Sequence, residues 1–67
     1  MPKVLKVIEV VSDSKENYED AIEKGVKETS KSVRNVRSVK VDEFSASVKN
    51  GKIDRYQVRL KIAFEIE

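Results

Sequence analysis

Cysteine, histidine and tryptophan are absent from this sequence of 67 residues, and it contains only two glycines and one proline. Without cysteine, neither a disulfide nor a thiolate metal site can form. Without histidine, the chain lacks the commonest general base and the commonest transition-metal ligand. No glycine-rich phosphate loop occurs, and we expect the two glycines to serve packing and a turn. These absences argue against an enzyme.

The short length limits how much surface the chain can bury. A chain of 67 residues forms one domain, so we expect residues 1–67 to be a single unit. Such a chain buries only about 60% of the surface that its unfolded form exposes. Natural domains of this size usually add a disulfide, a metal or a partner subunit. Since the chain has no cysteine to form a disulfide, and neither cysteine nor histidine to bind a metal, we predict a closed homo-oligomer.

Apolar residues nowhere form a run long enough for a signal peptide or a membrane span. We therefore expect a cytoplasmic protein that does not enter a membrane. The 14 basic and 12 acidic residues leave a net charge of +2, and the two signs alternate along the chain. This pattern favours a hydrated surface over a tail that binds polyanions.

The first half of the chain predicts a strand and a helix. Val4–Val11 is rich in β-branched residues, and its nearly continuous apolar run predicts burial on both faces over part of its length. Asp13 or Ser14 is the expected helix cap. Gly25 lies on the apolar stripe of the helix and predicts close approach to the sheet. That stripe, with helical spacing, comprises Tyr18, Ala21, Ile22, Gly25, Val26, Thr29 and Val33.

The second half predicts a long hairpin. Apolar residues change parity within Val36–Val48, which indicates a β-bulge near Asp42 and Glu43. Asn50-Gly51 is a strong two-residue turn signal. Strict alternation follows in the third strand, where the apolar face comprises Tyr56, Val58, Leu60, Ile62, Phe64 and Ile66. The fold class is therefore α+β: a β-α-β-β chain whose three-stranded antiparallel sheet wraps on one helix.

Basic residues on the predicted strands raise nucleic-acid binding as a second reading. A cationic sheet face can follow phosphates, but single strands also need exposed aromatic platforms, and Phe44 is the one candidate. Acidic neighbours dilute the patch, so we do not expect nucleic acid as a partner. The basic residues concerned are Arg34, Arg37, Lys40, Arg55, Arg59 and Lys61.

Carboxylates are the remaining candidates for a metal site. The chain has no calcium loop of the D-x-D-x-D-G type. Asp13, Asp42 and Glu43 offer the oxygen ligands that calcium prefers, if several subunits bring them together at a symmetry axis. A helix cap and a polar bulge explain the same residues more simply, so the metal ligands stay unassigned.

Three segments together resemble the dodecins, over essentially the whole chain. They are Lys6-Val7-Ile8-Glu9-Val10-Val11, then Tyr18-Glu19-Asp20-Ala21-Ile22, and the closing run Tyr56-Gln57-Val58-Arg59-Leu60-Lys61-Ile62-Ala63-Phe64-Glu65-Ile66. The resemblance implies a β-α-β-β subunit that assembles as a hollow homododecamer. It also implies a non-enzymatic protein that binds and stores a small molecule.

The resemblance further implies where a ligand binds. In flavin-binding dodecins, paired isoalloxazine rings stack between tryptophans of neighbouring subunits, and a glutamine of the last strand hydrogen-bonds the ring edge. Gln57 matches that glutamine, whereas the tryptophan position falls on Ser38. Arg37 offers a guanidinium plane beside it, although strand alternation places it on the opposite face.

This departure at Ser38 implies a dodecin of the type without the stacking tryptophan. Binding of riboflavin or FMN would then be weak or lost, because serine has no ring on which a flavin can stack. Some dodecins of this type bind calcium. The alternative is therefore a calcium-binding or ligand-free structural assembly.

Overall fold

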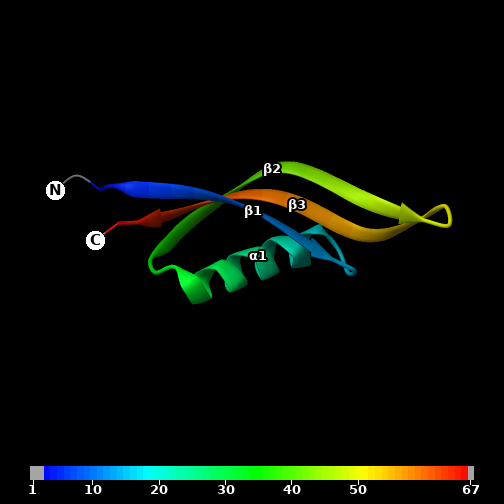
Figure 1. Ribbon diagram of the computed structural model, residues 1–67, viewed down its shortest axis with the longest axis horizontal. Coiled ribbons are helices and arrows are strands. Elements are labelled where there is room, and N and C mark those ends of the chain that lie inside the picture. Colours follow the sequence, from blue (N-terminus) through cyan, green and yellow to red (C-terminus); the bar gives the residue numbers. More distant parts are fainter. Residues whose placement is uncertain (1–2, 67) are drawn as a thin grey trace.

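One helix covers one face of a three-stranded sheet in the computed structural model, which describes residues 3–66 (Figure 1). Along the chain, β1 (Leu5–Ser14) is followed by α1 (Tyr18–Ser32), β2 (Val36–Lys49) and β3 (Lys52–Glu65). The strand order in the sheet is β1-β3-β2, and both neighbouring pairs are antiparallel. The predicted α+β class and β-α-β-β order are confirmed.

The core lies between the central strand and the helix. Val58, Leu60 and Ile62 of β3 are fully buried, and so is Ala21 of α1. Each buried Val, Leu or Ile side chain contributes about 1.5–3 kcal/mol relative to an exposed one. The apolar face predicted for the third strand is therefore the core face. Among the described residues, no further hydrophobic side chain reaches the same burial, so the core is small.

Gly25 is the point where α1 comes closest to the sheet. It is buried, and a Cβ atom built on it would lie 2.6 Å from Cδ1 of Leu60 and 3.1 Å from Cβ of Ser12. The helix can approach this closely only because glycine has no side chain. The predicted close approach is confirmed.

The helix begins later than the sequence predicts. β1 continues to Ser14, which pairs with Tyr56, so neither Asp13 nor Ser14 is the cap. Asn17 is the N-cap, and its side-chain oxygen accepts a hydrogen bond of 2.7 Å from the amide of Asp20. The cap prediction was wrong because pairing with β3 holds β1 extended for three residues beyond Val11.

Ser14 nevertheless supports the start of the helix. Its hydroxyl, which is buried, donates to Oδ2 of Asp20 at 2.5 Å and accepts from the amide of Glu16 at 2.9 Å. The hydrogen bond from Ser14 lowers the pKa of Asp20, and Lys24 lowers it further. Charge and hydrogen bonding thus join the end of β1 to the first turn of α1.

The β2–β3 hairpin extends well beyond the helix and accounts for the elongated shape, 54 × 20 × 14 Å (Figure 1). Its turn is at Asn50-Gly51, with φ of 54° and 74°, as the sequence predicts. The register shifts between Val41 and Glu43, which confirms the predicted bulge. Two more shifts, between Val36 and Ser38 and between Ser47 and Val48, were not predicted.

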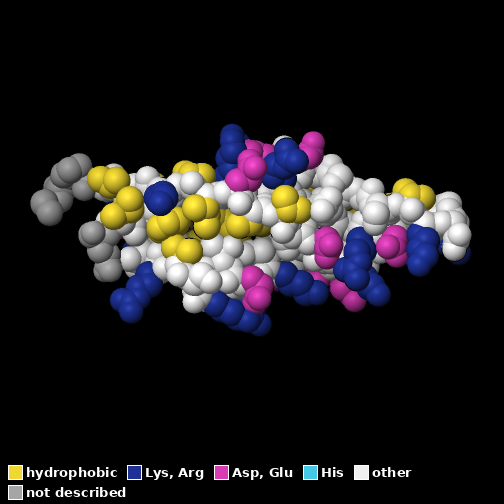
Figure 2. Space-filling view, in the orientation of Figure 1, with side chains coloured by type: hydrophobic (Ala, Val, Ile, Leu, Met, Phe, Trp, Pro, Cys, Tyr) yellow, Lys and Arg dark blue, Asp and Glu magenta, His cyan; other side chains and the backbone are white. Residues whose placement is uncertain are grey.

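β1 buries only one of its faces within the single chain. Ile8 and Val10 pack against the core, whereas Val7 and Val11 on the other face are each 56% exposed. The prediction that the first strand is buried on both faces therefore does not hold within the single chain. Exposed apolar side chains gather near the end of the molecule where the chain begins (Figure 2).

Candidate functional site

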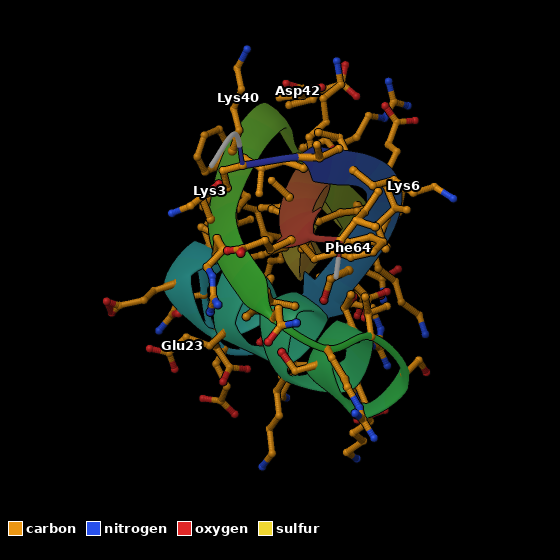
Figure 3. All side chains as sticks on the ribbon, turned by 90° about the vertical axis from the view of Figure 1, so that its left-hand side faces the viewer. Lys3, Lys6, Glu23, Lys40, Asp42 and Phe64 are labelled. Carbon is orange, nitrogen blue, oxygen red and sulfur yellow. The ribbon has the colours of Figure 1, made fainter. Side chains whose placement is uncertain are left out.

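Two of the three predicted ligand residues, Ser38 and Gln57, belong by strand register to the side of the sheet that faces away from α1, here called the outer face. Figure 3 views the molecule from one end, and there Lys40 and Asp42 of β2 point away from the helix that carries Glu23. Arg37, Ser38 and Gln57 are all exposed. By strand register, the outer face comprises Val7, Glu9, Val11 and Asp13 of β1, Ser38, Lys40, Glu43, Ser45 and Ser47 of β2, and Arg55, Gln57, Arg59, Lys61 and Ala63 of β3.

Gln57 lies in the middle of this face, between one residue of each neighbouring strand. Its partners in register are Asp13 on β1 and Ser45 on β2. The hydroxyl of Ser45 donates a hydrogen bond of 3.3 Å to Oε1 of Gln57. A shallow cavity of about 120 Å³ adjoins the amide, and it is lined by Val11, Glu43, Ser45, Gln57, Val58 and Arg59.

Ser38 lies on the same face but far from Gln57. It pairs with Ala63, which is six residues beyond Gln57 on β3. At a rise of roughly 3.3 Å per residue, the two positions are about 20 Å apart. The structure therefore does not bring Ser38 and Gln57 together within one chain.

Arg37 is held by an acidic side chain and not by Ser38. Its Nε atom lies 3.1 Å from Oε1 of Glu65. Simple alternation places Arg37 opposite Ser38, but the register shifts between Val36 and Ser38. The guanidinium of Arg37 thus pairs with a carboxylate near the end of β3. The expectation that Arg37 lies on the face opposite Ser38 stays a prediction.

The other outer-face cations of β3 are also paired with carboxylates. Arg55 lies 3.1 Å from Asp13, and Lys61 lies 3.2 Å from Asp42. Arg59 lies 3.6 Å from Glu43. A phosphate backbone would have to compete with these carboxylates for the cations. The arrangement gives no support to a nucleic-acid interface.

The three candidate metal ligands are the carboxylates of these same ion pairs. Asp13, Asp42 and Glu43 each face a different basic side chain. Within residues 3–66, no three acidic side chains come close enough to hold one metal ion. A calcium site built from these residues would therefore need carboxylates of more than one subunit.

A larger hollow lies elsewhere, between the free edge of β1 and the helix. Its volume is about 650 Å³, and it is open to solvent on one side. Ile8 and Val10 belong to its lining on the sheet side, and Gly25 and Thr29 on the helix side. Its lining includes the candidate metal ligand Asp13 but none of Arg37, Ser38 and Gln57, so it is separate from the predicted flavin site.

Sequence reasoning did not single out Ser45, although it is the described side chain that hydrogen-bonds Gln57. Ser45 lies opposite Gln57 only because the register shifts between Ser47 and Val48, and no pattern in the sequence signals this shift. Within the described residues, no helix is long and apolar enough to cross a membrane.

The chain is similar to several solved dodecin structures. It is 25% identical to dodecin from Streptomyces davaonensis, with a TM-score of 0.95 over 100% of this chain and 98% of that one. A variant of Thermus thermophilus dodecin is 30% identical, with a TM-score of 0.93 over 98% of each chain. The calcium dodecin of Mycobacterium tuberculosis, described as having a novel calcium-binding site, is 31% identical, with a TM-score of 0.83 over 96% and 91%.

Comparison with curated proteins finds no match. The family profile for dodecin, in contrast, matches residues 4–67. This match spans nearly the whole chain, and it agrees with the element order, the antiparallel sheet and the likeness to solved dodecins. The chain therefore belongs to the dodecin family.

Proposed function

We propose that this protein is a non-enzymatic dodecin that binds and buffers a small planar ligand in a homododecameric cage, with weak affinity for flavins. Flavin binding and homododecameric assembly are typical of the family. The observation that carries the proposal is the separation of Ser38 from Gln57 on one exposed face. A flavin ring is too short to contact both residues of one chain, so a complete site needs a second subunit.

Exposed apolar side chains support the assembly. Val7 and Val11 on β1 are each 56% exposed, and Phe44, Val48 and Ile53 on the hairpin are 57%, 68% and 55% exposed. Each Å² of apolar surface removed from water contributes about 25 cal/mol. Since the core of the single chain is small, contact between copies would supply the burial that the chain lacks.

The residue at position 38 argues for weak flavin binding. Stacking of a base on an aromatic side chain contributes about 1–3 kcal/mol, and serine has no ring. A hydrogen bond exchanged against water contributes only about 0.5–1.5 kcal/mol net, which is all that Gln57 supplies. A site with the hydrogen bond and without the stacking should therefore recognise the ring edge but hold it weakly.

Purification and titration test this proposal. Light scattering should give a mass near twelve chains, and the protein should be colourless. Riboflavin should bind weakly, as measured by quenching of its fluorescence. Ser38→Trp should raise the affinity about 5- to 150-fold, which corresponds to the roughly 1–3 kcal/mol of one stacking contact.

Ser47→Trp is the matched control, because Ser47 is exposed on the same face of the same strand but near the hairpin turn. It should leave riboflavin binding unchanged. A monomeric mass would contradict the cage. A protein that arrives yellow with tightly bound flavin, or equal effects of the two tryptophans, would contradict the role given to Ser38.

Calcium binding is the second candidate, because one of the similar structures is that of a calcium dodecin. Asp13, Asp42 and Glu43 are the carboxylates that neighbouring subunits would have to bring together. This reading predicts that calcium raises the melting temperature, since an ion that binds only the folded state stabilises it. Magnesium should do so less, and Asp42→Asn should reduce the calcium effect. An unchanged melting temperature would favour a ligand-free assembly.

A further inference from the structure

The hydrogen bond between Ser45 and Gln57 determines which end of the glutamine amide a ligand can meet. A glutamine side chain has an accepting oxygen and a donating NH₂ group at opposite ends. The hydroxyl of Ser45 donates to the oxygen, Oε1, at 3.3 Å. Among residues 3–66, Nε2 has no hydrogen-bond partner. Within the part of the chain that the structure describes, the donating end of this exposed residue is therefore left for a ligand.

The two arginines next to Gln57 on the same face of β3 are both engaged elsewhere. Arg55 is paired with Asp13 on β1 at 3.1 Å, and Arg59 with Glu43 on β2 at 3.6 Å. Because the two guanidinium groups pair with carboxylates on opposite sides of β3, neither takes the amide of Gln57. Among the residues that the structure describes, Ser45 is thus the side chain that hydrogen-bonds the Gln57 amide.

The surroundings of the amide fit the edge of a planar ring. The shallow cavity beside it, about 120 Å³, is lined by both Ser45 and Gln57 and also by Val11. Val11 is 56% exposed, so it offers apolar surface to a ring whose edge faces the amide. A carbonyl oxygen or ring nitrogen at that edge would accept a hydrogen bond from Nε2.

We propose that Ser45 is a positioning residue that turns the donating end of Gln57 toward the ligand. The site would then select planar heteroaromatic molecules whose edge carries a carbonyl oxygen or a ring nitrogen. This inference rests on the proposed function, in which Gln57 contacts the ligand. At 3.3 Å the Ser45 hydrogen bond is long, so its orienting effect on affinity is small but measurable.

A double-mutant cycle with riboflavin tests the inference, carried out in the Ser38→Trp variant so that affinities are measurable. Ser45→Ala should raise the Kd about 2- to 5-fold, the lower range expected for one hydrogen bond. Ser47→Ala, which removes an exposed hydroxyl two residues away on the same face, should not change it. In the Gln57→Ala background, Ser45→Ala should have no further effect.

Two outcomes of the cycle would overturn the inference. One is an equal Kd for Ser45→Ala and Ser47→Ala. The other is a Ser45→Ala effect of the same size with and without Gln57, because Ser45 would then act on the ligand by itself.

If riboflavin binds none of these variants, the proposed function fails, and crystal structures of the unliganded protein decide the role of Ser45. The native protein should show one orientation of the Gln57 amide, with Oε1 toward Ser45. Ser45→Ala should show more than one orientation. A single unchanged orientation in Ser45→Ala would refute the positioning role independently of any ligand.

Discussion

Replacing Gly25 with alanine sets two effects of opposite sign against each other. Alanine is favoured over glycine inside a helix by about 1 kcal/mol. The added Cβ atom, however, would lie 2.6 Å from Cδ1 of Leu60 and 3.1 Å from Cβ of Ser12. Leu60 is fully buried, so its side chain has no open space to enter, and overpacking a core costs about 1–3 kcal/mol. Gly25→Ala should therefore lower the free energy of unfolding by about 1 kcal/mol.

Urea unfolding at one fixed protein concentration measures this change, because the stability of an oligomer depends on concentration. Ser30→Ala, at an exposed position of α1, is the control and should raise stability by a few tenths of a kcal/mol, roughly the propensity difference. Leu60→Val removes Cδ1, so its cost should be smaller in the Gly25→Ala background than in the native protein. If Gly25→Ala stabilises the protein as Ser30→Ala does, the helix and sheet are not in close contact here.

Four further outcomes are expected. Leu60→Ala should cost about 2–5 kcal/mol, whereas Lys61→Ala on the outer face should cost under about 1 kcal/mol; equal losses in urea unfolding would refute the face assignment. Gly51→Ala should cost about 1–2 kcal/mol, because φ is 74° there; unchanged stability would contradict the turn. Asp20 has a lowered pKa, so it contributes stability above its usual pKa that is lost as the pH falls below about 4; Ser14→Ala should reduce that loss in acid titrations. Single-stranded DNA should not bind at physiological salt, and tight binding by fluorescence anisotropy would contradict the ion-pair assignment.

The parts of the fold that could be predicted are those that leave a local pattern. Strict alternation in β3 identifies Leu60 as core and Lys61 as exposed, since a strand turns successive side chains to opposite faces. A change of parity at Asp42-Glu43 predicts the bulge, because one extra residue reverses the alternation. Asn50-Gly51 predicts the turn, since both residues must adopt positive φ.

Register irregularities without a change of hydrophobic pattern could not be predicted. Counting back from the turn, where Lys49 pairs with Lys52, would place Phe44 opposite Gln57. The shift between Ser47 and Val48 places Ser45 there instead. Such a shift depends on how β2 pairs with β3 over its whole length, and composition does not report it. The hydrogen bond of Ser45 to Gln57 therefore could not be predicted from the sequence.

The two faces of the sheet separate the residues that fold the chain from those that would hold a ligand. Leu60 and Ile62 are buried against the helix, and changes there would disrupt the subunit. Ser38 and Gln57 are exposed on the outer face, where substitutions away from special features usually change stability by less than about 0.5 kcal/mol. A serine or a tryptophan at position 38 is therefore compatible with the same subunit. For this reason the fold identifies the family, whereas the ligand site that we propose depends on positions 38, 45 and 57.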